Sequence, residues 1–321
     1  MSQLERSPLR KGQIRFLRVL RWPAVILIFL FLGKTVWENW AQVRGTPFIF
    51  NGPLLFFSTL VFAFSYFIQI WAWYLITLKL GIAIPFGATL SSWFYSQLGK
   101  YLPGKIWLLL SRFYFYESEG KSKKAISVAL YIETMTMILA SGLLFLAGLI
   151  SSAGMRLPVL PGGAEWLMFL LPLAFVAIHP RICEKILNGI LIRLGREAVG
   201  LSLSYADVLW VLFVCVLSWI VGGIGFYFFV ISVVPVSFEF FPFLTGALAF
   251  SSTLGLVALF APSGLGVREG VLVYLLSSLM PTAVAVIVSI LTRLWMTLIE
   301  IGLIVMIYLM GKFPKGQTRK A

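Results

Sequence analysis

The chain has 321 residues, of which 60% are hydrophobic and 12% are charged, about half the charged fraction of a typical soluble protein. This composition excludes a soluble enzyme, because so much apolar surface has to be covered by lipid. The formal net charge of +14 does not predict nucleic-acid binding, since 18 of the 26 Lys and Arg residues lie in four short clusters beside the apolar runs.

The four basic clusters predict which side of the membrane each loop occupies. Cytoplasmic loops carry an excess of Lys and Arg, so the clusters, and with them both chain termini, are expected on the cytoplasmic side of the bacterial inner membrane. The clusters occupy residues 1–21, 111–124, 179–207 and 311–321. Residues 1–321 are expected to form a single membrane domain that begins with a basic N-terminus and ends with a basic tail.

The apolar runs of the first half predict its crossings. About 20 apolar residues cross the hydrocarbon core, and runs of this kind are residues 22–40, 54–78 and 125–150. Residues 84–110 begin and end beside basic clusters, so they must cross an even number of times. Two full crossings need about 40 helical residues, but only 27 are available. A break at residues 99–105 therefore predicts a re-entrant hairpin that enters from the cytoplasm.

The second half repeats this order from the outside. Full spans are predicted at residues 166–178, 208–234 and 283–310. Residues 240–279 are expected to start and end outside, and the interruption at residues 261–270 predicts a second re-entrant hairpin. The predicted fold is therefore an all-α integral membrane protein with six full transmembrane helices and two re-entrant helical hairpins.

Residues 54–150 and 208–310 form a predicted inverted repeat with a spacing of about 155 residues. Inverted repeats with broken helices in matching places are typical of transporters whose site lies near the membrane midplane. The alternative is that ambiguous short spans produce this symmetry by chance. Loss of the short span at residues 166–178 would reverse the orientation of the second repeat.

The two breaks are the predicted binding region, because irregular backbone at membrane depth needs protein or a water-filled cavity around it. The residues expected to line this cavity are Gly99, Pro103, Gly104, Pro262, Gly264 and Gly266. The cations expected to hold a lipid phosphate, together with half-helix N-termini, are Lys100, Lys105, Arg268 and Arg293. Alternatively, Lys100 and Lys105 join the cytoplasmic surface, and Arg268 pairs with Glu269 or Glu300 to hold its hairpin together.

Charged residues inside the predicted spans need partners, since each costs about 2.5–3.5 kcal/mol to insert. Glu133 and Glu300 are predicted to bind a cationic part of the headgroup or to carry a proton. Arg293 and Glu300 share a helix face but stand about 10 Å apart along its axis, which implies a partner from elsewhere. The alternative is a structural ion pair between Glu133 and Arg293. The Cys and His residues have no metal-site spacing, and no cofactor is expected.

Two motifs carry a resemblance to a known family. The segment QLGKYLPGKIW at residues 97–107, followed by Arg112, and the segment PSGLGVREG at residues 262–270 resemble the signatures of the flippase-like family named for the lysylphosphatidylglycerol synthase transmembrane region. Glu133 lies where that family tends to carry a glutamate. The resemblance covers about residues 15–310, and it implies an anionic or modified lipid as substrate, polyprenyl-linked glycolipids included.

The leading hypothesis is translocation of an anionic phospholipid or lipid-linked intermediate across the membrane through a cavity between the repeats. The expected partners are a phospholipid or polyprenyl-linked lipid and a lipid-modifying enzyme, and no nucleic acid. The sequence has no nucleotide-binding loop of the G-x-x-x-x-G-K-[ST] type, so a gradient or mass action is expected to drive transport.

Enzymatic activity is not expected, because no catalytic motif is recognised. Eleven residues follow Met310, so the aminoacyl-transferase domain of the full synthases, and with it lipid lysylation, is not expected either. One alternative is a membrane glycosyltransferase that uses a lipid-phosphate sugar donor, which needs a carboxylate base; the first external loop offers only Glu38. A third hypothesis is a scaffold that recruits a lipid-modifying enzyme.

Overall fold

The structure is a computed structural model that describes most of the chain as a bundle of helices. The described residues are 30, 33–34, 36–38, 40–46, 48–101, 106–151, 175–176, 178–193, 203–258 and 261–310. They contain helices and turns and no strand. The basic termini at residues 1–21 and 311–321, most of the predicted spans at residues 22–40 and 166–178, and Pro103, Gly104 and Lys105 lie outside them.

Four long helices run through the bundle. They are α3 (Gly52–Lys79), α6 (Lys123–Ser151), α9 (Tyr205–Val233) and α12 (Thr282–Leu309). Each has 28 or 29 residues and is about 42 Å long, more than the hydrocarbon core requires. A fifth segment, Phe238–Val257, also has the length and apolar character of a membrane span. The described part of the chain thus has five candidate spans, as expected for a multi-pass membrane protein.

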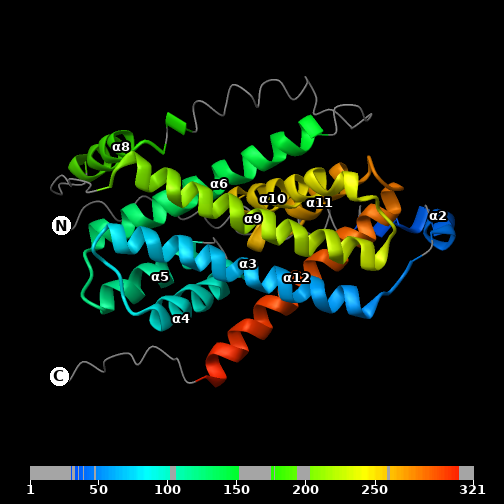
Figure 1. The fold of residues 1–321 in the computed structure, drawn as a ribbon, viewed down its shortest axis with the longest axis horizontal. Coiled ribbons are helices and arrows are strands. Elements are labelled where there is room, and N and C mark those ends of the chain that lie inside the picture. Colours follow the sequence, from blue (N-terminus) through cyan, green and yellow to red (C-terminus); the bar gives the residue numbers. More distant parts are fainter. Residues whose placement is uncertain are drawn as a thin grey trace, which may run out of the picture.

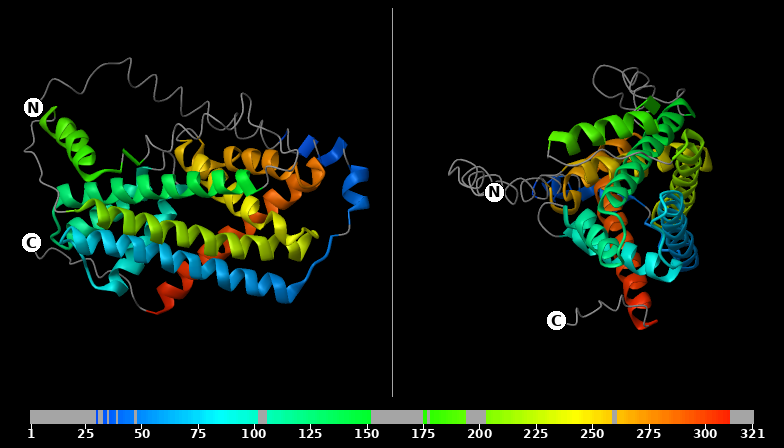
Figure 2. Two further views of the ribbon diagram at one scale, coloured as in Figure 1. Left: turned by 45° about the horizontal axis from the view of Figure 1, so that its top comes forward. Right: turned by 90° about the vertical axis from the view of Figure 1, so that its left-hand side faces the viewer.

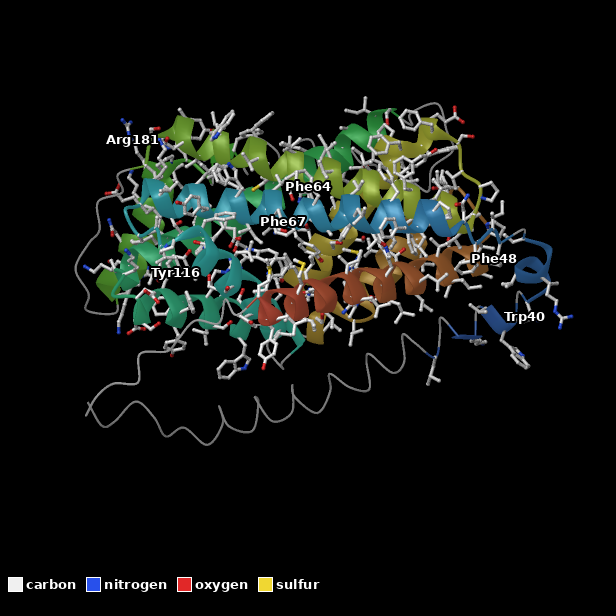
Figure 3. The ribbon with its side chains drawn as sticks, turned by 60° about the horizontal axis from the view of Figure 1, so that its bottom comes forward. Trp40, Phe48, Phe64, Phe67, Tyr116 and Arg181 are labelled. Atoms are coloured by element: carbon white, nitrogen blue, oxygen red, sulfur yellow. The ribbon has the colours of Figure 1, made fainter. Side chains whose placement is uncertain are left out.

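The two ends of the bundle differ in character. The end of α3, the start of α6 and α8 (Pro180–Arg193) lie together at one end, here called the basic end because it holds Lys79, Lys123 and Arg181 (Figure 1). The short helix α2 (Trp40–Gly45) lies at the opposite end. Figure 3 shows the same polarity, with Arg181 and Tyr116 toward one end and Trp40 and Phe48 toward the other.

Helices α3 and α9 are antiparallel neighbours over their whole length. At the basic end, Lys79 Nζ lies 2.8 Å from a carboxylate oxygen of Asp207. At the other end, the amide of Ile49 donates to the carbonyl oxygen of Val233 over 2.9 Å. Between them Gly225 fits tightly, because a Cβ there would lie 2.9 Å from the backbone nitrogen of Phe62. Helices α3 and α9 are therefore held together at both ends and in the middle.

The first predicted hairpin is a broken pair of short helices. Helix α4 (Phe86–Gln97) leads into the 3-10 turn η1 (Leu98–Tyr101), and α5 (Ile106–Ser118) returns beside α4 to the basic end (Figure 1). The arms are about 18 and 20 Å long, too short to cross a bilayer alone. A Cβ at Gly99 would lie 2.5 Å from the α5 backbone, which explains why glycine stands at this break.

The second arm of this hairpin extends further than the sequence predicted. The prediction ended the hairpin at residue 110 and assigned residues 111–124 to a cytoplasmic loop, but α5 continues to Ser118. The reason is Arg112, whose side chain is 3% exposed and forms an ion pair inside the bundle. Charge alone could not distinguish this buried arginine from a loop residue.

The second broken pair consists of η2 (Phe238–Phe240), α10 (Phe241–Val257), η3 (Pro262–Gly264) and α11 (Val267–Leu276). Helices α10 and α11 pack side by side, and η3 contacts η1 of the first pair. Gly264 has a φ of 70°, and a Cβ there would lie 2.5 Å from the carbonyl oxygen of Gly255 on α10. Only glycine at position 264 therefore allows the chain to make this tight reversal.

We expect Gly264→Ala to destabilise the protein by at least about 2 kcal/mol, because alanine is strained at this φ and its Cβ collides with backbone. Thermal unfolding of the purified protein in detergent, followed by tryptophan fluorescence, measures the effect. The matched control is Gly270→Ala on α11, where a Cβ meets nothing within 4 Å. Equal unfolding temperatures for the two variants would contradict the assignment of a strained turn at Gly264.

Candidate functional site

The contact between η1 and η3 brings together five charged residues, here called the central cluster. They are Lys100 from η1, Arg268 and Glu269 from α11, and Arg293 and Glu300 from α12. Lys100 Nζ lies 2.5 Å from Glu300 Oε2, and the two side chains are 24% and 2% exposed. This ion pair joins residues 200 positions apart and connects the first break to α12.

Arg293 and Glu269 hold the second break in its bent shape. Arg293 Nη1 lies 3.0 Å from Glu269 Oε1, and Nη2 donates to the carbonyl and hydroxyl oxygens of Ser263 over 3.1 and 2.8 Å. Ser263 itself has a φ of 50°. The second oxygen of Glu269 accepts from the amide of Gly266 over 2.7 Å and so caps the start of α11. One arginine thus stabilises a backbone that has no helical partners at this point.

Arg268 lies beside this network, next to Glu269 in sequence, and contacts α12 at a separate point. Its guanidinium contacts the sulfur of Met296 on α12 and lies within electrostatic range of Arg293, Glu269, Tyr66 and Glu300. Gly255 makes room for it, because a Cβ there would lie 2.9 Å from the Cβ of Arg268. Among the described residues, Arg268 is the cation of the central cluster that forms no ion pair with a carboxylate.

The charges of the central cluster favour an anion. Three cations and two carboxylates leave one net positive charge, and both carboxylates contact a cation other than Arg268. In a site shielded from water this positive charge acts more strongly than at a surface. A phosphate is the kind of group that an arginine binds through two parallel hydrogen bonds. The described residues contain no group of three or more His, Cys, Asp or Glu that could hold a metal ion.

Glu133 lies outside the central cluster, in a second buried network. Its Oε2 lies 2.5 Å from Nη1 of Arg112 on α5, and its Oε1 accepts from the indole of Trp93 over 3.3 Å. The Arg112 guanidinium also stacks on Trp73 at 4.6 Å from the ring centroid. Glu133 and Arg293 are therefore not partners of each other, and the ion pair considered between them does not form.

The structure unites four of the six charged residues that the sequence singled out, Lys100, Arg268, Arg293 and Glu300. Gly99, Pro262, Gly264 and Gly266 lie in or beside the breaks, and that they line a cavity stays a prediction. Sequence reasoning missed the roles of Arg112 and Glu269. Glu269 could have been found as the third residue of a helix that starts after a glycine, where a carboxylate caps the backbone. Arg112 stands among aromatic residues, the one signal of its burial.

We expect Arg112→Gln and Glu133→Gln each to lower the stability or abundance of the folded protein strongly. Each leaves one buried charge without its partner, which costs about 3–5 kcal/mol. The double variant Arg112→Gln with Glu133→Gln should recover part of this loss. Thermal unfolding in detergent checks the result, with Lys123→Ala as control for the exposed pair of Lys123 and Glu117. Singles as stable as this control would show that the buried pair is unimportant for folding.

No curated protein sequence matches the chain significantly. The family described as the lysylphosphatidylglycerol synthase TM region matches residues 14–303, a range that contains both breaks and the whole central cluster. The match extends over far more than half of the chain. The protein therefore belongs to the lysylphosphatidylglycerol synthase TM region family.

Proposed function

We propose that the protein moves a phosphate-bearing lipid, an anionic phospholipid or a lipid-linked intermediate, across the bacterial cytoplasmic membrane. The observation that carries this proposal is the central cluster, where two broken helix pairs meet with one net positive charge. Broken helices that meet inside a bundle are typical of transporter binding sites. Acyl or prenyl tails would stay in the bilayer while the headgroup passes between the two halves of the protein.

The proposed architecture behind this function is an inverted repeat with α3 to α6 as one half and α9 to α12 as the other. Two observations support it. The first broken pair starts and ends at the basic end, and the second starts and ends at the opposite end (Figures 1 and 2). Each half also has a long helix before its broken pair and another after it. We take both pairs as re-entrant, although α10 with η2 has the length of a span.

In this proposal Arg268 is the principal phosphate ligand. It is the charged group of the central cluster that no carboxylate neutralises directly, and its planar fork matches two phosphate oxygens. Lys100 is a second ligand that has to exchange its contact with Glu300 for one with the phosphate. In exchange, Glu300 would hold a cationic part of the headgroup or a proton. Arg293 acts mainly on the shape of the second break.

We expect Arg268→Ala to lower lipid translocation at least tenfold, and Arg268→Lys to lower it less, because lysine keeps the charge but not the bidentate geometry. Translocation is measured in proteoliposomes as the loss of dithionite protection of a fluorescent phospholipid. Arg181→Ala, an exposed position at the basic end, is the control. Arg268→Ala protein that unfolds at the parent temperature and still translocates at the parent rate would refute the proposal.

The proposed orientation has a separate test. In a background of Cys183→Ser and Cys215→Ala, a cysteine at Asn51 should react with an impermeant thiol reagent from outside the cell. A cysteine at Ser122 should react only after the membrane is opened. Both positions are exposed, at opposite ends of the bundle. Labelling of both from the same side would exclude the proposed topology.

A further inference from the structure

Two contacts that the proposed repeat makes equivalent are packed very differently. In one of them α6 lies closely along α10. A Cβ at Gly246 would lie 2.7 Å from the carbonyl oxygen of Leu144, and one at Gly148 would lie 2.8 Å from that of Pro242. Between these points the rings of Phe145 and Phe250 stack at 4.1 Å. Here the backbones of the two halves approach as closely as glycine allows.

The equivalent contact between the halves is that of α12 with α4, and it extends over only a short stretch. Figure 2 shows α12 running obliquely across the bundle, so that its C-terminal end leaves past α3. Two of its contacts near the breaks are the ion pair of Lys100, in η1 directly after α4, with Glu300 on α12 and the electrostatic proximity of Tyr95 on α4 to Tyr308 on α12. We call this contact the α4–α12 seam.

A neighbouring contact between the halves shows the same asymmetry. Helix α6 packs closely on α9, whereas its proposed equivalent α12 touches α3 only briefly. Within the halves, α10 also packs on α9 more extensively than its proposed equivalent α4 packs on α3. The asymmetry is therefore a property of the whole arrangement. The two halves are tightly joined around α6 and α10, toward the end opposite the basic end, and loosely joined around α4 and α12.

We infer that the α4–α12 seam is the lateral entrance through which a lipid reaches Arg268 from the cytoplasmic leaflet. This inference rests on the proposed function. A phosphate that enters here meets Lys100 first, which is 24% exposed, and releases it from Glu300. Arg268, which lies within electrostatic range of both Lys100 and Glu300, is then the next cation for the phosphate. In the inferred state that opens toward the other leaflet, α4 closes onto α12 and α6 separates from α10.

The surface beside the seam suits the tails of such a lipid. Leu98 in η1 is 45% exposed, Trp107 at the start of α5 is 47% exposed, and Tyr308 on α12 is 58% exposed. These side chains are apolar or aromatic, and they belong to η1, α5 and α12, the elements at or next to the seam. A lipid whose phosphate contacts Lys100 can therefore leave its tails outside the seam, in contact with the bilayer, without burying them in the protein.

Cross-linking tests the entrance. In the cysteine-free background, Tyr95→Cys with Tyr308→Cys is joined across the seam by a short, reducible bifunctional thiol reagent. The matched control joins Phe145→Cys with Phe250→Cys across the tight contact. A photoactivatable phospholipid reports binding, and dithionite protection reports translocation. The seam cross-link should lower both at least tenfold, and reduction should restore them. The control cross-link should leave photolabelling unchanged and stop translocation.

A second measurement does not depend on cross-linking. Leu98→Cys modified with a bulky thiol reagent should lower photolabelling at least fivefold. The control is Leu298→Cys modified in the same way, because Leu298 is 69% exposed on α12 and stands about 200° around the helix from Glu300; its photolabelling should not change. Unchanged photolabelling with the seam cross-linked, or with Leu98→Cys modified, overturns the entrance.

Arg268→Ala in the same assay distinguishes the entrance from the proposed function itself. If Arg268→Ala photolabels as strongly as the parent, the phosphate site is wrong, and the entrance falls with it. If Arg268→Ala loses photolabelling but the cross-linked seam retains it, the site stands and only the entrance is wrong. Loss of photolabelling in both supports the site and the entrance together.

Discussion

Every charge that the bundle buries has to be compensated within the protein, since lipid offers no hydrogen bonds. The structure meets this constraint with local pairs. Arg112 with Glu133 ties α5 to α6, and Arg293 with Glu269 ties α12 to α11. In the proposed repeat these two pairs occupy equivalent places with the signs exchanged, each joining the second arm of a broken pair to the long helix that follows. The two buried ion pairs thereby hold the second arm of each broken pair against the long helix that follows it.

The same constraint distinguishes charges that stabilise the structure from charges proposed to bind a ligand. Arg293 is held by Glu269 and by both oxygens of Ser263, so moving it would release the backbone of the second break. Among the described residues, the Arg268 guanidinium has the sulfur of Met296 as its side-chain hydrogen-bond partner, a weak acceptor that a phosphate can replace easily. Lys100 lies between these cases, because its carboxylate partner belongs to the other half of the protein. In the proposed function, such a site would exchange ligands without disturbing the contacts that hold the second break.

Much of the fold followed from the sequence, because lipid imposes long uncharged runs and tolerates breaks only at glycine and proline. The four long helices begin and end within a few residues of their predictions at 54–78, 125–150, 208–234 and 283–310. The partners of the charges did not follow. Which carboxylate contacts Arg293 depends on the rotation and depth of α11 against α12. The hydropathy pattern predicts neither. For the same reason Arg112 was assigned to a loop, since a basic residue in α5 and one beyond it differ only in their neighbours.

In the proposed transporter, the single net positive charge of the central cluster would also make the site sensitive to the membrane potential. One elementary charge that moves across 100 mV changes its energy by about 2.3 kcal/mol. A singly charged phosphate on Arg268 would cancel the charge, so the loaded site would respond little to voltage. The empty site would keep its charge, and an inside-negative potential would draw it toward the cytoplasm. The unloaded protein would therefore favour the conformation in which its site faces the cytoplasmic leaflet.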